Sequence, residues 1–212
     1  MAPWPHWSPR LKISILVEGK TEMAFKSHLI AFLGTRLAGR MPRLDMWPYD
    51  GRIPKEDKLK RVVENLLTSG RQPSDAVMAL TDVYTGTDDF VDATDAKRKM
   101  RMWVGNNDRF FPHAAQYDFE AWLLPFWEAI QTIAGHNRAA PPGPPESVNH
   151  IRPPAHHVRE IFRIGTCRDA YSKPRDANKI LQGKDLSIAA ARCPELKAFL
   201  NSIVTISGGI PL

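Results

Sequence analysis

The sequence predicts an α/β protein with a mostly parallel four-stranded central sheet flanked by helices, followed by a helical C-terminal region. Short apolar runs that stop abruptly alternate with longer stretches in which apolar side chains recur at helical spacing. The chain has 212 residues, enough for one hydrophobic core, and its 43% hydrophobic and 25% charged residues are typical of a globular protein.

Four short segments are predicted to form the strands. Residues 13–17 are apolar and mostly β-branched and stop at Glu18, as a buried parallel strand does. Residues 76–80 form a similar apolar run. Weaker strand candidates lie at 44–47 and 110–111.

Helices are predicted between these strands. One opens at Thr21, and others cover residues 58–67 and 93–103. The clearest amphipathic pattern spans 117–135, and we expect one continuous helix there. Its apolar stripe contains Phe119, Trp122, Leu123, Phe126, Ile130 and Ile133.

Proline content suggests the domain organisation. Residues 11–135 are predicted to form the α/β core, after an extended arm at 1–10. Residues 136–155 are predicted to form a linker or a surface excursion, because six prolines in this region exclude a helix or an inner strand. Residues 156–212 are predicted to form short helices that pack on the core.

Charge and cysteine usage indicate the setting. Lys plus Arg exceed Asp plus Glu by 29 − 23 = 6, and the isoelectric point is about 9.4. This excess favours a polyanionic partner such as nucleic acid, although many proteins simply have a basic surface. Cys167 and Cys193 lie far apart, which favours reduced thiols. With no apolar run long enough to span a membrane and no secretory pattern, we expect a cytoplasmic protein without membrane contact.

The first chemical motif is the segment VEGKTE, which follows the strand at 13–17. Glu18 at the carboxyl end of a parallel strand points into the crevice where α/β sheets bind ligands. Glu22 falls in the first helical turn, and together the two acids could share one Mg²⁺ ion. An ordinary strand end and a helix N-terminal acid are an equally good interpretation. A Walker A loop is rejected, because Ser14 stands where that loop needs its first glycine.

A second acid, Asp82, ends the strand at 76–80 and should lie on the same edge as Glu18. Two strand ends that carry acids at one edge favour a metal site over two unrelated turn residues. A third acid, Glu120, lies on the flank of the predicted helix at 117–135. Its alternative role is dipole complementarity at a helix start capped by Asp118.

Basic side chains could contact the phosphates of a nucleic acid. Two helical stretches carry them, although such runs are often only solvated helix faces. The candidate nucleic-acid contacts are Lys97, Lys99, Arg101, Lys173 and Arg175, and Lys179 is the further cation in the second stretch.

The segments ILVEGKTE and TDVYTG together resemble the Toprim domain of topoisomerases, bacterial primases and overcoming-lysogenization-defect (OLD) nucleases. The resemblance implies a Rossmannoid fold in which Glu18 and Asp82 bind divalent metal. Tyr84 departs from the pattern, because the family has a second aspartate there. A stand-alone Toprim-like family, encoded beside SMC-like or ABC-type ATPases in bacterial defence loci, is similar in this respect. It also matches at the segments FEA (119–121) and CP (193–194).

The resemblance implies a nuclease that acts with an ATPase partner and cuts DNA in preference to RNA. Glu18, Glu22, Asp82 and Glu120 would hold one or two Mg²⁺ or Mn²⁺ ions. Glu18 could also act as the general base, and Lys179, or else Lys173, would neutralise charge on the phosphate. Two alternatives stay open: a non-catalytic regulatory subunit of the ATPase, and an effector that cleaves RNA such as tRNA.

Overall fold

The structure is a computed structural model that describes residues 11–84, 88–147, 152–166 and 170–212. In this part of the chain four strands form one sheet in the order β2-β1-β3-β4, and every neighbouring pair is parallel. The predicted α/β class and its parallel four-stranded sheet are confirmed. The strands are β1 (Lys12–Val17), β2 (Arg43–Pro48), β3 (Ala76–Asp82) and β4 (Phe110–Ala115).

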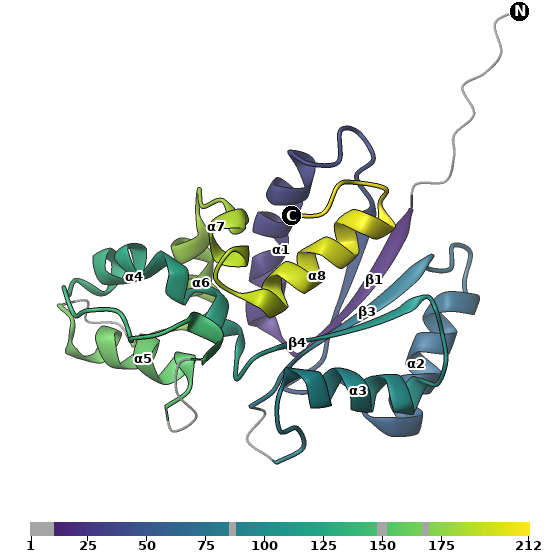
Figure 1. Ribbon diagram of the computed structural model, residues 1–212, viewed down its shortest axis with the longest axis horizontal. Coiled ribbons are helices and arrows are strands. Elements are labelled where there is room, and N and C mark those ends of the chain that lie inside the picture. Colours follow the sequence, from purple (N-terminus) through teal and green to yellow (C-terminus); the bar gives the residue numbers. More distant parts are fainter. Residues whose placement is uncertain (1–10, 85–87, 148–151, 167–169) are drawn as a thin grey trace, which may run out of the picture.

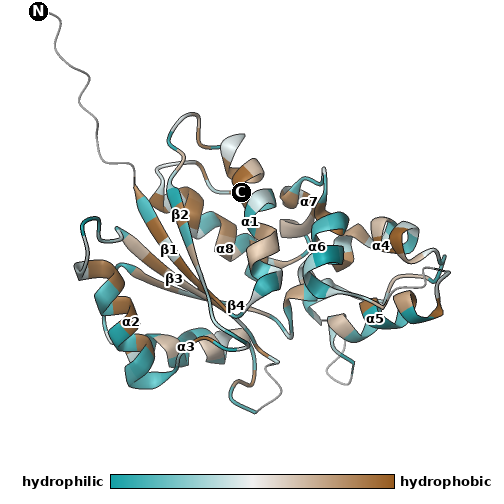
Figure 2. Ribbon diagram, turned by 180° about the vertical axis from the view of Figure 1, so that it is seen from behind, coloured by the Kyte–Doolittle hydropathy of each residue, from teal (hydrophilic) through white to brown (hydrophobic). Residues whose placement is uncertain are grey.

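Helices cover both faces of the sheet (Figure 1). Ile13, Ile15 and Val17 of β1 pack in the apolar cluster of one face, whereas Leu16 packs in the cluster of the other face. Because β1 is buried on both sides, residues 13–17 are apolar except Ser14, whose buried hydroxyl is hydrogen-bonded to that of Ser74 at 2.8 Å. Figure 2 shows the central strands as mainly hydrophobic and the flanking helices as mixed. The covering helices are α1 (Lys20–Gly34) and α8 (Pro194–Ile206) on one face, and α2 (Glu56–Thr68) and α3 (Ala93–Val104) on the other.

A helical lobe lies beside the sheet, near the carboxyl ends of the strands (Figure 1). It is joined to the sheet layer through aromatic contacts: Trp122 stacks on Phe199 of α8 at 6.0 Å and lies 6.2 Å from Phe25 of α1. The lobe therefore shares one apolar cluster with the sheet face. The domain boundaries proposed from the proline content stay a prediction. The helices of the lobe are α4 (Trp127–Ala134), α5 (Pro154–Ile164), α6 (Lys173–Leu181) and α7 (Leu186–Ala190).

The continuous helix predicted over 117–135 is wrong. Two short 3₁₀ turns, η1 (Phe119–Trp122) and η2 (Leu124–Phe126), come first, and only then does α4 begin. Pro125 explains the break, because proline has no N–H to donate and its ring clashes with the carbonyl four residues earlier in an α-helix. The predicted apolar side chains are still largely buried.

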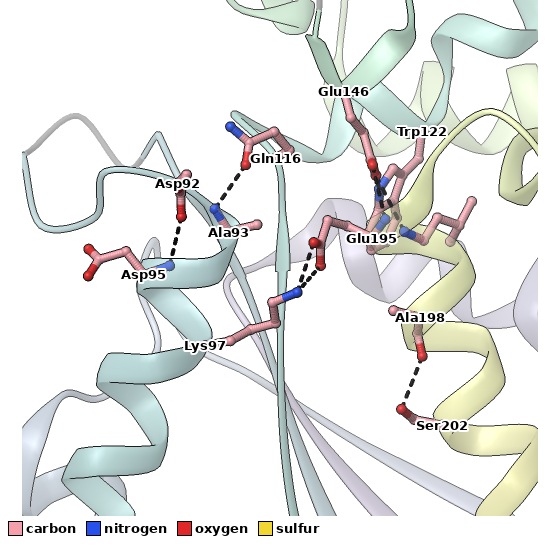
Figure 3. Close-up of polar contacts among 11 residues, drawn as sticks. Asp92, Ala93, Asp95, Lys97, Gln116, Trp122, Glu146, Glu195, Ala198 and Ser202 are labelled. Atoms are coloured by element: carbon pink, nitrogen blue, oxygen red, sulfur yellow. Dashed lines mark hydrogen bonds and ion pairs between the residues drawn. The ribbon is translucent and has the colours of Figure 1, made fainter.

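The proline-rich stretch is anchored to the fold by one buried carboxylate. Glu146, in the 3₁₀ turn η3 (Pro145–Ser147), accepts hydrogen bonds from Trp122 Nε1 at 3.0 Å and from the Glu195 backbone N–H at 2.9 Å (Figure 3). A negative charge at the start of α8 is also favoured by the helix dipole. Glu146 is therefore packed against the fold, and the prediction of a linker or a surface excursion over 136–155 stays a prediction. Among the described helices, none has the length and apolar character needed to cross a membrane.

Candidate active site

The two strand-end acids lie side by side. Val17 of β1 pairs with Leu80 of β3, so the residues that follow them emerge together at the carboxyl edge of the sheet. The Asp82 backbone N–H donates to Glu18 Oε1 at 3.2 Å, and the Thr81 hydroxyl donates to the same oxygen. The parallel pairing of β1 with β3 thus brings together two acids that are 64 residues apart.

Two further acids predicted as metal ligands are buried near this edge. Glu22, in the first turn of α1, accepts a hydrogen bond from the Gly19 N–H at 3.0 Å and so holds the turn between strand and helix. Glu120 in η1 has no exposed surface. Its oxygens accept hydrogen bonds from the Tyr171 hydroxyl at 3.2 Å and from Lys173 Nζ at 3.0 Å.

Asp118 is a fifth acid of the site, which sequence reasoning considered only as a helix cap. It is buried, and both of its oxygens accept the Ala155 backbone N–H, at 3.1 and 3.3 Å. Asp118 follows the end of β4 by three residues. The pattern that singled out Glu18 and Asp82, an acid just after a buried strand, would also have found it.

Four of these acids, Glu18, Glu22, Asp82 and Asp118, have raised pKa values. Burial, together with the charge of Glu22, raises the pKa of Glu18 to about 7. Burial raises the pKa of Asp82 well above its usual range, and the charges of the other four acids add to this effect. The pKa of Asp118 rises to about 7 through burial and the charge of Glu120, and burial also raises the pKa of Glu22. The edge therefore concentrates negative charge that favours a cation.

Lys173 supplies part of the compensating charge. Burial by itself would lower its pKa, but the charges of Glu120, Asp82 and Asp118 raise it overall. The structure places the Lys173 ammonium against the fully buried Glu120 carboxylate. Lys179 lies six residues further along α6 and is exposed. At 1.5 Å per residue this is roughly 9 Å along the helix axis.

The other predicted cations lie away from this edge or contact acids of their own. Lys97 of α3 forms an ion pair with Glu195 at 2.6 Å (Figure 3), and Lys99 forms one with Asp95 at 2.8 Å. Arg101, in the last turn of α3, is exposed. Arg175 forms an ion pair with its neighbour Asp176 at 2.8 Å. The ion pairs reduce the positive charge that these side chains offer to a phosphate.

The donor set fits a hard divalent cation by its chemistry, because Mg²⁺ and Mn²⁺ prefer carboxylate oxygens. In the described part of the chain, however, no three acidic, histidine or cysteine side chains form a group ready to hold a metal ion. Glu22 uses one carboxylate oxygen in a hydrogen bond, and Glu120 uses both. Tyr84, at the place of a second family aspartate, is 61% exposed. Metal binding would therefore require the acid side chains to move closer together than they lie here, while their oxygens can still accept hydrogen bonds through a second lone pair.

The fold and this edge define a class: an α/β protein whose parallel sheet carries buried acids at its carboxyl edge. The C-terminal region of the Burkholderia pseudomallei OLD protein has a similar fold, with a TM-score of 0.50 and 14% sequence identity over 90% of this chain and 98% of that chain. A comparison with curated protein sequences finds no match. The chain belongs to the family described as "Domain of unknown function (DUF4276)", whose model matches residues 17–203.

Proposed function

We propose that this protein is a divalent-metal-dependent nuclease that hydrolyses phosphodiester bonds at the acidic edge. The observation that carries the proposal is the convergence of acids at the carboxyl ends of β1, β3 and β4, together with one from the first turn of α1; Glu22, Asp118 and Glu120 are buried. The resemblance of VEGKTE and TDVYTG to Toprim motifs and the OLD-like fold support the same class. The proposed ligands of Mg²⁺ or Mn²⁺ are Glu18, Glu22, Asp82 and Glu120.

In this proposal, separate residues of the acidic edge and of α6 have separate roles in phosphodiester hydrolysis. A bound divalent cation would neutralise the charge that builds up on the phosphate during displacement. Glu18, whose pKa is raised to about 7, is suited to accept a proton from the attacking water at neutral pH. Lys173, or else Lys179 on the same helix, would stabilise the negative charge on the phosphate oxygens. Asp118 would position Glu120 by keeping the segment after β4 attached to α5 through Ala155.

Cleavage assays test the proposal directly. The purified protein is given plasmid DNA, single-stranded DNA and total tRNA in parallel, with Mg²⁺ or Mn²⁺, and the tRNA arm tests the RNA-cleaving alternative. Glu18→Gln and Asp82→Asn should each reduce cleavage at least 100-fold, because each removes a charged ligand. Glu64→Gln, an exposed acid on α2, is the matched control and should cleave normally. Unchanged cleavage by both site variants would refute the proposal.

A second candidate function is a non-catalytic regulatory subunit of an SMC-like or ABC-type ATPase in a cytoplasmic defence complex. Two observations favour it: the lack of a ready metal-ligand group among the described residues, and the ion pair of Lys173 with Glu120. Nucleic acid that stays intact with metal, ATP and the ATPase present, while the chain changes the ATPase rate, would favour this function. Cleavage by the chain alone would exclude it.

A further inference from the structure

A groove lies along the edge strand β2, on the face of the sheet that α2 and α3 cover only in part. Within the described residues, the apolar cluster beneath these helices takes side chains from β1, β3 and β4, and none from β2. The flank of the face beside β2 is open, and it forms a hollow of about 820 Å³. The lining residues on which the argument depends are Lys12, Arg43, Trp47, Tyr49 and Arg71.

An exposed aromatic side chain is the main feature of this groove. Trp47 pairs with Leu16 of β1, which faces α2 and α3, so its side chain lies on the same face. The indole is 45% exposed, yet its Nε1–H donates to Ser14 Oγ at 3.3 Å. The hydrogen bond orients the ring while much of its surface stays in contact with water. Tyr49, two residues later, is a second aromatic side chain in the groove.

The charged side chains that line the groove in the described structure are all cations. Arg43 and Arg71 are exposed, and Lys12 lies between β2 and the loop before β3. Asp45 forms ion pairs with Lys12 at 3.4 Å and with Arg43 at 3.0 Å, so one acid offsets part of this charge. A groove with cations, one exposed aromatic ring (Trp47) and one half-buried aromatic ring (Tyr49) matches the chemistry of a polyanion that also carries flat rings.

The groove leads towards the acidic edge. The Tyr49 N–H donates to the Val17 carbonyl at 2.9 Å, and the Gly51 N–H donates to the Glu18 carbonyl at 3.0 Å. The end of β2 is therefore attached to the backbone of the first acid of the site. From Arg43 to Tyr49 the strand spans about 20 Å at ~3.3 Å per residue. This is the length of roughly six nucleotides at ~3.4 Å per nucleotide of a stacked strand.

We infer that this groove binds a single-stranded polynucleotide and guides it to the acidic edge. A single strand is favoured over a duplex, because only unpaired bases expose faces that can stack on Trp47 and Tyr49. Lys12, Arg43 and Arg71 contact the phosphates. The role as a substrate path rests on the proposed nuclease function, whereas the binding itself does not.

Fluorescence anisotropy with a labelled oligothymidylate, at low salt and with EDTA present, tests the inference in the absence of cleavage. Trp47→Ala should weaken binding about tenfold or more, and Trp47→Phe, which keeps an aromatic face, should bind within a few-fold of wild type. Arg71→Ala should lower the slope of log affinity against log salt by about 0.7. Arg61→Ala, an exposed cation of α2 outside the groove, is the matched control and should change neither quantity.

The outcomes separate this inference from the proposed function. If both Trp47→Ala and Arg71→Ala keep the affinity and the salt slope of wild type, the inferred binding of a single strand in this groove is refuted. Trp47-dependent binding of an acidic peptide in preference to the oligonucleotide would refute it as well. Trp47-dependent binding of the oligonucleotide without cleavage in Mg²⁺ would support the inferred binding groove and refute the proposed nuclease function. Cleavage of single strands by Trp47→Ala with an unchanged KM would support the proposed nuclease function and refute the inferred binding groove. Denaturation midpoints measured for each variant identify any loss of folding.

Discussion

Replacing Glu18 with glutamine should stabilise the metal-free protein at high pH. The folded-state pKa of Glu18 is raised from 4.5 to about 7, mainly by burial. The folded state therefore holds this proton where the unfolded state has lost it. A raised acid pKa contributes stability below the unfolded value and loses it as the pH rises through the folded value. Glutamine mimics the protonated acid at every pH, and its oxygen can still accept the hydrogen bonds from Thr81 and Asp82.

The size of the effect follows from the shift. A change from 4.5 to about 7 is worth about 3 kcal/mol once the pH is well above both values. The unfolding free energy of Glu18→Gln minus that of wild type should be below about 1 kcal/mol near pH 5 and about 3 kcal/mol near pH 8. Burial lowers the pKa of His113 to about 3, so this histidine contributes stability that is lost as the pH falls, which is the opposite trend to that of Glu18. His113 affects the wild type and the variant equally, so its contribution cancels in the difference between their unfolding free energies.

Urea denaturation followed by tryptophan fluorescence, in EDTA at several pH values, measures this difference. Addition of Mg²⁺ at high pH should then stabilise the wild type more than the variant, because the cation compensates the charge that the variant lacks. Glu64→Gln serves again as the exposed control, and its difference from wild type should not grow with pH. A variant that is equally stable as, or less stable than, wild type near pH 8 would refute the electrostatic account of this edge.

Two further substitutions test the contacts around the site. Lys173→Met leaves the buried Glu120 carboxylate without its cation and should lower the unfolding free energy in EDTA by about 2 kcal/mol. This loss is smaller than that expected for a fully buried ion pair, because the lysine side chain is 35% exposed. Added Mg²⁺ should restore part of this loss, and equal stability with and without the lysine would contradict the assignment. Glu146→Ala should cost about 3 kcal/mol in urea denaturation, because it leaves the Trp122 indole N–H and the first backbone N–H groups of α8 without their acceptor. Glu195→Ala, which removes only the ion pair with Lys97, should cost less than about 1 kcal/mol, and a larger loss than in Glu146→Ala would contradict the capping role.

The sheet could be predicted from the sequence because burial on both faces leaves apolar side chains at nearly every position of residues 13–17 and 76–80. The same rule predicted the edge on which Glu18 and Asp82 lie, since parallel neighbouring strands end on one side. The helix expected at 117–135 was wrong because the apolar period was given more weight than Pro125. The periodicity is set by burial, which the 3₁₀ turns and α4 achieve together, and not by a continuous hydrogen-bond ladder.

The sequence by itself determined the fold class and the nearness of the two strand-end acids, because these depend on local pattern and on strands that are direct neighbours. Only the tertiary structure decided that Lys173 of α6 neutralises Glu120, that Asp118 joins the acids, and that Trp47 stays uncovered beside α2. Each of these depends on how a helix packs against a segment distant in the chain. Such packing depends on contacts among many side chains from distant segments, and it cannot be predicted from a local pattern of residues.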